Sequence, residues 1–203
     1  MREADHVICA APCMIKPVTP SGSMSPIGDR RGQLYNLTTS TMTILISHSA
    51  EETESLGEAL GRAMQPGDVI ALTGDLGAGK TCLTRGIARG LGVSDAVTSP
   101  TFILVAEYAT RSGATLYHAD CYRLGDAAVA EAESIGLAEM MAGDGFAVIE
   151  WAERIDRLLP ADALRVELVA IDDSQRRIDL HAGGARSRAL ARALEHLKPV
   201  PCC

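Results

Sequence analysis

The stretch GDLGAGKT, residues 74–81, has the residue types and spacing to bind a nucleotide phosphate. It matches G-x-x-x-x-G-K-[ST], the pattern of a P-loop. The glycines permit backbone angles that bring successive N–H groups onto a phosphate, and the helix beginning near Lys80 adds its positive end. Lys80 would reach the β- and γ-phosphates, and the Thr81 hydroxyl would ligate Mg²⁺. The predicted phosphate-binding residues are Gly74, Asp75, Leu76, Gly77, Ala78, Gly79, Lys80 and Thr81.

Two acidic residues could supply the carboxylate that a P-loop needs at the end of a neighbouring strand, either to hold magnesium or to orient the attacking water. Glu150 follows four apolar residues in FAVIE, and Asp120 ends the pattern TLYHAD. Either acid could instead be a solvated loop residue, and Asp120 could pair with Arg123. From the residues alone, both acids are candidates for the metal and water chemistry.

A third feature is the short segment VTSPTF, residues 97–102. Pro100 restrains Ser99 to an extended conformation, which leaves Thr101 with its hydroxyl at the lip of a strand. A hydroxyl at that point could contact the γ-phosphate or a magnesium-bound water. The same pattern is equally compatible with the plain start of a strand.

The elements that must hold these residues follow from the apolar patterns along the chain. Ser49 and Glu52 predict a capping box at the start of a helix. Leu56, Leu60 and Met64 form the apolar stripe of that helix before PGD ends it. Further helices are predicted at 80–92, 126–143 and 186–197, and strands at 43–49, 68–74, 102–109, 115–120, 146–151, 163–171 and 176–182.

The order of these elements predicts an α/β fold. Strands and helices alternate in the first half, whereas strands follow one another later, which indicates a mixed sheet with a parallel centre. The strands 102–109 and 115–120 would form a hairpin around TRSG, and two later strands are joined by DDSQ. We therefore expect a mixed, mostly parallel central sheet flanked by helices, with antiparallel strand pairs.

The length and composition allow one domain with a sizeable core, because 47% of the 203 residues are apolar. Residues 1–41 are rich in Pro, Ser, Gly and Thr and show no sustained period, so we predict a flexible N-terminal extension or a start assigned too early. Residues 42–198 would form the P-loop domain, and residues 199–203 a short tail.

The charge and hydropathy exclude some partners. A net charge of −7 disfavours tight direct binding to nucleic acid, which relies on basic residues that neutralise phosphates. No apolar run approaches the roughly 18 residues that a membrane span needs. The N-terminal apolar patch follows two acids and is interrupted by Pro12, unlike a secretory signal. We expect a cytoplasmic protein without membrane contact.

Motifs that the chain lacks narrow the class of P-loop protein. No N-K-x-D string supports guanine-specific recognition, and no L-S-G-G-Q-like string supports a transporter ATPase. A small-molecule kinase is one alternative, although no lid-like insertion with several arginines is visible. A scaffold that binds nucleotide without hydrolysing it is another, and the two acids count against it.

Four strings, GDLGAGKT, VTSPTF, LYHADCYRL and VIEWAERI, occur in the order and approximate spacing of one known family. Over about residues 42–196 the chain resembles the bacterial TsaE-type (YjeE-like) P-loop ATPases, the ATPase subunit of the tRNA adenosine(37) threonylcarbamoyltransferase complex. Two departures lie beside Asp120: Ala119 stands where the family usually has phenylalanine, and Cys121 where it usually has leucine. The resemblance implies a P-loop NTPase fold with ATP and Mg²⁺ as cofactors.

The resemblance also implies roles for single residues. Lys80 and the glycine-rich cradle would bind the phosphates, and Thr81 and Glu150 would hold magnesium. Asp120 would be a catalytic acid needed for hydrolysis, and Thr101 falls in a segment that responds to the nucleotide.

Three further positions follow from the resemblance alone. Trp151 falls where the family keeps a tryptophan close to the active site. Ser49 and Arg176 lie near where the family flanks the nucleotide. These three residues are expected to contact or border the bound ATP.

The partners that the resemblance implies are proteins. They are the transferase subunit that places threonylcarbamoyl on adenosine 37 and that subunit's non-catalytic paralogue, so tRNA would be contacted only indirectly. We expect slow ATP hydrolysis that resets the complex between modification cycles. The net negative charge suits a subunit that binds protein partners rather than RNA.

Overall fold

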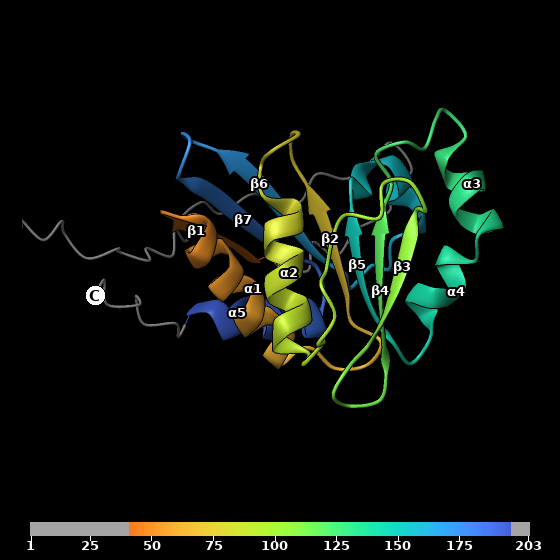
Figure 1. Ribbon diagram of the computed structural model, residues 1–203, viewed down its shortest axis with the longest axis horizontal. Coiled ribbons are helices and arrows are strands. Elements are labelled where there is room, and N and C mark those ends of the chain that lie inside the picture. Colours follow the sequence, from red (N-terminus) through yellow and green to blue (C-terminus); the bar gives the residue numbers. More distant parts are fainter. Residues whose placement is uncertain (1–40, 196–203) are drawn as a thin grey trace, which may run out of the picture.

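The computed structural model describes residues 41–195 (Figure 1). The predicted N-terminal extension and C-terminal tail lie outside the described residues, except for Thr41, which begins the first strand. Seven strands form one sheet in the order β1-β7-β6-β2-β5-β4-β3. The strands are β1 (Thr41–Ser47), β2 (Val69–Thr73), β3 (Val105–Ala109), β4 (Thr115–Asp120), β5 (Phe146–Glu150), β6 (Leu164–Ala170) and β7 (Arg176–Ala182).

The centre of the sheet is parallel and its edges are antiparallel. Strand β2 pairs in parallel with β5 and β6, and β5 pairs in parallel with β4. The edge pairs β3–β4, β6–β7 and β1–β7 are antiparallel. The predicted mixed sheet with a parallel centre is therefore confirmed, together with its two hairpins.

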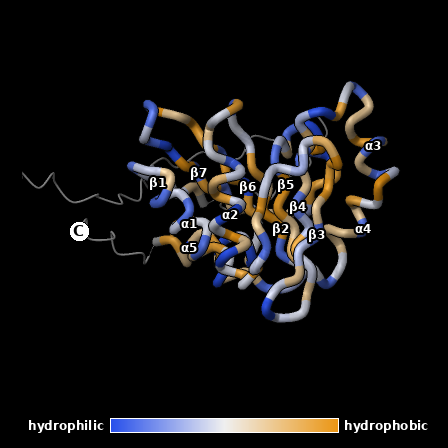
Figure 2. Tube along the Cα trace, viewed as in Figure 1, coloured by the Kyte–Doolittle hydropathy of each residue, from blue (hydrophilic) through white to orange (hydrophobic). Residues whose placement is uncertain are grey.

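Helices cover both faces of the sheet. One core contains apolar side chains of α1 (Ala50–Ala63), α2 (Lys80–Gly90) and α5 (Ala185–Glu195). The other contains side chains of α3 (Ala128–Ser134), α4 (Leu137–Ala142) and the 3₁₀ segment η1 (Ala152–Leu158). Hydrophobic residues gather along the central strands in Figure 2. The fully buried strand β5, FAVIE, has the continuous apolar run that a parallel strand covered on both faces requires.

The start of α1 matches its capping pattern with one variation. Ser49 Oγ accepts the N–H of Glu52 at 3.1 Å, as a capping residue does. The Glu52 carboxylate accepts the N–H of His48, one residue before the cap, at 2.7 Å. Two N–H groups at the helix start are thus satisfied by side chains, and the helix begins where the sequence predicts.

Several predicted element bounds differ from the structure, and three of these differences have a clear local cause. The strand predicted at 102–109 begins at Val105, because the N–H groups of Ile103 and Leu104 both bond to the carbonyl of Pro100 in a turn. The helix predicted over 126–143 is divided at Gly136, whose φ of 78° is left-handed. The strand predicted to include Trp151 ends at Glu150, since Trp151 has a φ of 58°.

The helices α1 and α2 pack at backbone contact. A Cβ added to Gly57 would lie 2.2 Å from the carbonyl oxygen of Leu83, and one added to Gly86 would lie 2.1 Å from that of Glu54. Gly61 and Gly90 repeat this arrangement one turn later. Only glycine allows the two helices to approach so closely. The helix that carries Lys80 is therefore fixed against α1.

Candidate functional site

The site lies where the parallel strands β2, β4 and β5 end. A cavity of about 380 Å³ opens there, next to the start of α2. Ligands bind at the carboxyl ends of strands in open α/β sheets, because the loops diverge there. The residues that line this cavity are Leu76, Gly77, Gly79, Lys80, Thr81, Cys82, Ser99, Thr101, Asp120, Tyr122, Glu150 and Trp151.

The loop between β2 and α2 has the backbone of a phosphate cradle. Gly74, Gly77 and Gly79 have φ values of 127°, 80° and 106°, which favour glycine. A Cβ at Gly74 would lie 2.2 Å from the Leu168 carbonyl oxygen, so the loop also lies tightly against β6. The loop leads into the first turn of α2, whose free N–H groups attract anions.

The ammonium of Lys80 is hydrogen-bonded to the backbone of this loop. Its Nζ donates to the carbonyl oxygens of Gly74 at 2.5 Å and of Asp75 at 2.9 Å. It also lies 3.8 Å from the ring centroid of Trp151, a cation–π contact. Burial lowers the pKa of Lys80, and the nearby acids, with Glu150 first, oppose that shift. The side chain is thus a buried cation held at the mouth of the cradle.

Glu150 joins β5 to α2 and β4 through its carboxylate. The Thr81 hydroxyl donates to its Oε2 at 2.9 Å, and His118 Nε2 lies 2.8 Å from its Oε1. Thr84 Oγ1 also donates to Oε1, at 3.4 Å. Only 2% of Glu150 is exposed. The carboxylate is therefore oriented on both oxygens beside the hydroxyl that a P-loop uses for Mg²⁺.

Asp120 lies beside Glu150, because the two residues are paired in the β4–β5 register. Its Oδ2 accepts hydrogen bonds from the hydroxyl of Thr101 at 2.6 Å and from that of Ser99. Its Oδ1 accepts the N–H of Tyr122 at 3.0 Å. The segment VTSPTF is thus tied to the end of β4 through one carboxylate.

Two strained backbone positions adjoin the two acids. Leu104, with φ 65°, accepts the N–H of Asp120 on its carbonyl oxygen at 2.9 Å. Trp151, with φ 58°, follows Glu150 and packs against Tyr122 with ring centroids 4.8 Å apart. A left-handed conformation costs a residue with a side chain about 1–3 kcal/mol, and such strain gathers at functional sites.

Comparison with known proteins identifies the family. The family model "Threonylcarbamoyl adenosine biosynthesis protein TsaE" matches residues 47–178. The chain belongs to the TsaE family. The resemblance inferred from the four sequence strings is thereby confirmed.

Relatives of the TsaE family match most of their own length. The tRNA threonylcarbamoyladenosine biosynthesis protein TsaE of Bacillus subtilis is 40% identical over 144 residues, which cover 71% of this chain and 88% of the relative. The protein of the same name from Treponema pallidum is 43% identical over 133 residues, covering 66% and 96%. The crystal structure of Bacillus subtilis YdiB has a TM-score of 0.65 and 34% identity, and the match covers 77% of this chain and 96% of that one.

The structure brings most of the predicted site residues of this TsaE-family chain to one cavity. Arg176 instead lines an adjoining cavity of about 80 Å³, together with Gly79 and Cys82. Ser49 lines neither of these two cavities, because its hydroxyl caps α1, but its neighbour Ala50 lines the smaller one. The residues gathered in the larger cavity are Leu76, Gly77, Gly79, Lys80, Thr81, Thr101, Asp120, Glu150 and Trp151.

Sequence reasoning missed two side chains that hold the acids. His118 lies two residues before Asp120, and alternate residues of a strand share a face. That spacing could have placed its imidazole next to the acids. Ser99 lies two residues before Thr101, and the same reasoning would have paired their hydroxyls, which are 2.6 Å apart.

The donor set fits a nucleotide-bound magnesium rather than a metal held by protein alone. Within residues 41–195, no group of three or more His, Cys, Asp and Glu side chains could hold a metal ion. Mg²⁺ in nucleotide sites is held by one or two carboxylates together with phosphate oxygens and waters. Thr81 and Glu150, already in hydrogen-bond contact, match that requirement. In the same part of the chain, no helix is long and apolar enough to cross a membrane.

Proposed function

We propose that this protein binds ATP and Mg²⁺, hydrolyses ATP slowly, and serves as a cytoplasmic accessory subunit for forming N6-threonylcarbamoyladenosine at position 37 of tRNA. The observation that carries the proposal is the 2.9 Å hydrogen bond from Thr81 to Glu150, in a cavity that also contains Lys80 and Asp120. The family and the names of its members supply the pathway.

Each part of the cavity has a task in this proposal. The cradle and the start of α2 bind the β-phosphate through backbone N–H groups. Lys80 reaches the β- and γ-phosphate oxygens, and Thr81 and Glu150 hold Mg²⁺. The bound ion neutralises charge that develops on the phosphates. Asp120, which accepts a hydrogen bond from the hydroxyl of Thr101, is the acidic residue needed for hydrolysis and orients the attacking water through its carboxylate.

The remainder of the nucleotide extends from the cradle along the smaller cavity. Arg176 lines that cavity beside Gly79, and its guanidinium suits contacts to phosphate or ribose oxygens. Ser49 contributes indirectly, because it caps the start of α1, where Ala50 lines the same cavity. Trp151 borders the nucleotide from the other side, through the ring that lies over Lys80.

The partners in this proposal are the threonylcarbamoyl transferase subunit and its non-catalytic paralogue, with tRNA contacted only through them. The segments 97–102 and 118–124 meet at the cavity, because Asp120 bonds to Thr101 and Arg123 lies 4.0 Å above the ring of Phe102. A change in nucleotide state would alter both segments together. The transferase pair senses this surface, and ATP turnover resets the complex without ATP entering the chemistry on the tRNA.

Reconstitution with purified partners and tRNA tests the proposal. Lys80→Ala removes the cation that binds the phosphates, so we expect modification to stop after about one round per complex while the wild type continues. The melting temperature of the variant must show that it is folded. Multiple turnovers at the wild-type rate with folded Lys80→Ala would overturn the resetting role.

The same assay distinguishes the two alternatives. Modified tRNA formed at the full rate with Glu150→Ala would favour a nucleotide-binding scaffold, because hydrolysis would then be dispensable. Phosphate transferred to a small acceptor, instead of released into solution, would favour a kinase.

A further inference from the structure

A buried histidine contacts the acid that is proposed to hold magnesium. His118 is fully buried on β4, and its Nε2 lies 2.8 Å from Oε1 of Glu150. It does not line the nucleotide cavity. Its imidazole is thus linked to the cavity through Glu150, which lines it.

The surroundings of the ring settle which nitrogen carries the proton. An ionised carboxylate can only accept hydrogen bonds, so Nε2 must be the donor to Glu150. His118 Nδ1 is buried and has no hydrogen-bond partner among the described residues. A proton on Nδ1 would be a buried donor without an acceptor, which is costly. The contact with Glu150 therefore places a proton on Nε2.

The contact divides the two oxygens of Glu150 between two tasks. Oε1 faces the sheet interior, toward His118 and, at 3.4 Å, Thr84. Oε2 faces the cavity and the hydroxyl of Thr81. His118 and Val148 are paired in the β4–β5 register, two residues before Asp120 and Glu150. The imidazole donor is thus fixed by the sheet itself, next to the carboxylate that it orients.

We propose that His118 is a positioning residue, which holds Oε1 of Glu150 so that Oε2 stays beside Thr81 and is ready to bind the nucleotide-bound Mg²⁺. This inference rests on the function proposed above and adds a residue to it. A group that orients a metal ligand typically changes metal affinity or activity about 10- to 100-fold when it is removed. Binding without metal does not use Glu150 and should be unaffected.

Two amide substitutions separate positioning from simple packing. The amide nitrogen of glutamine can take the place of Nε2, whereas that of asparagine can take only the place of Nδ1. His118→Gln therefore keeps a donor toward Glu150, and His118→Asn removes it with the same functional group. His118→Leu removes the donor and keeps an apolar side chain in the core. Melting temperatures establish which variants are folded.

The experiment measures ADP affinity by calorimetry, once with excess Mg²⁺ and once with EDTA. The dissociation constant in EDTA divided by that in Mg²⁺ reports how strongly the metal supports ADP binding. We expect His118→Asn and His118→Leu to lower this ratio by about 10- to 100-fold, with the EDTA value unchanged. His118→Gln should keep most of the wild-type ratio.

Three results would count against one of the two proposals. A wild-type ratio in His118→Asn would overturn the positioning role, and so would a loss in His118→Gln equal to that in His118→Asn. A wild-type protein whose ADP affinity is the same with Mg²⁺ and with EDTA would instead overturn the proposed magnesium site, and with it the proposed function.

Discussion

At the residue scale, the two acids of the cavity differ in their hydrogen-bond donors. Glu150 is held by Thr81 and by the rigid imidazole of His118, so its carboxylate is fixed. Asp120 accepts on Oδ2 from the two hydroxyls of Thr101 and Ser99. Hydroxyl groups rotate, so these two donors can readjust when a water binds to Asp120. Asp120 is therefore the better placed of the two acids to orient a water.

Substitution of Asp120 by asparagine tests this division. The change keeps the shape and removes the charge, so ATP hydrolysis should fall by about 100-fold or more, while ADP affinity in Mg²⁺ stays close to that of the wild type. Phosphate release and calorimetry measure the two quantities. Asp126→Asn changes an exposed acid nearby and serves as the control. An unchanged rate of ATP hydrolysis in Asp120→Asn would mean that another group orients the attacking water.

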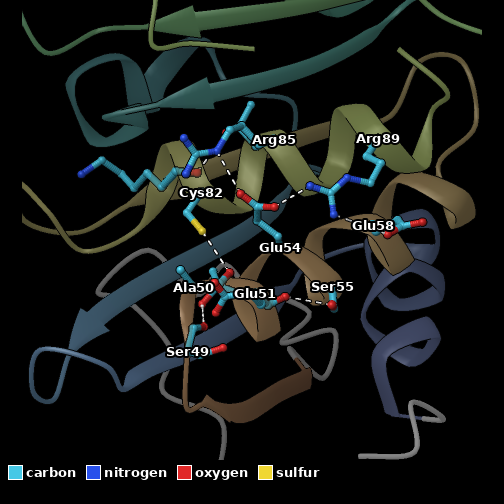
Figure 3. Close-up of polar contacts among 12 residues, drawn as sticks. Ser49, Ala50, Glu51, Glu54, Ser55, Glu58, Cys82, Arg85 and Arg89 are labelled. Atoms are coloured by element: carbon cyan, nitrogen blue, oxygen red, sulfur yellow. Dashed lines mark hydrogen bonds and ion pairs between the residues drawn. The ribbon is translucent and has the colours of Figure 1, made fainter. Parts of the chain in front are cut away.

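At the element scale, backbone contact between α1 and α2 contributes more to the attachment of the two helices than the ion pairs that join them. Glu54 accepts from Arg85 at 3.1 Å and from Arg89 at 2.5 Å, and Figure 3 shows Glu54 of α1 between the two helices, joined to both arginines of α2. Both arginines are about half exposed, whereas the Glu54 side chain is 20% exposed. Ion pairs at a surface contribute about 0–1 kcal/mol each. The contact of Gly57 with Gly86 sets the spacing between the helices.

Gly86→Ala distinguishes packing from helix propensity. Propensity alone predicts a gain of about 1 kcal/mol for alanine over glycine in a helix. The added Cβ would lie 2.1 Å from the Glu54 carbonyl oxygen and 2.9 Å from the Cα of Gly57, and neither backbone atom can yield alone. We expect a net loss of about 1–3 kcal/mol in the free energy of unfolding, as in overpacked cores.

Urea denaturation measures this change, with Ser55→Ala on the exposed face of α1 as the control for propensity. Gly86→Ala should lower the unfolding midpoint, and Ser55→Ala should not. A midpoint raised by Gly86→Ala would mean that the helices can separate at no cost. The firm attachment of the P-loop helix to α1 would then be disproved.

At the scale of the whole molecule, the site depends on contacts between strands that are far apart in the sequence. The P-loop could be predicted from the sequence because Gly74 to Thr81 are consecutive and follow a buried strand. Asp120 and Glu150 could be predicted because each ends an apolar strand. The spacing of His118 and Asp120 is visible in the sequence, but the contact of His118 with Glu150 also needs the β4–β5 register, which is not. The breaks at Leu104 and Gly136 depend on local backbone conformations that apolar periodicity does not record.

Within residues 41–195, the outer surface also offers a region suited to the proposed protein partners. Phe102 and Ile103 are consecutive and 82% and 70% exposed, and they follow Thr101, which bonds to Asp120. Large exposed apolar side chains close together mark sites of protein contact. Phe102 also carries the guanidinium of Arg123 over its ring, which links the two segments proposed to respond to nucleotide.

Phe102→Ser should therefore weaken binding to the proposed partner, the transferase pair, and leave the proposed nucleotide site intact, because Phe102 does not line the cavity. Loss of an aromatic side chain at the centre of an interface costs about 2 kcal/mol or more, or roughly a 30-fold loss of affinity. Affinity for the purified pair is measured with ATP present, and ADP affinity of the variant alone is measured by calorimetry. Ile135→Ser, at an exposed apolar position between α3 and α4, is the matched control. Equal affinities of Phe102→Ser and the wild type for the pair would place the partner interface elsewhere on the molecule.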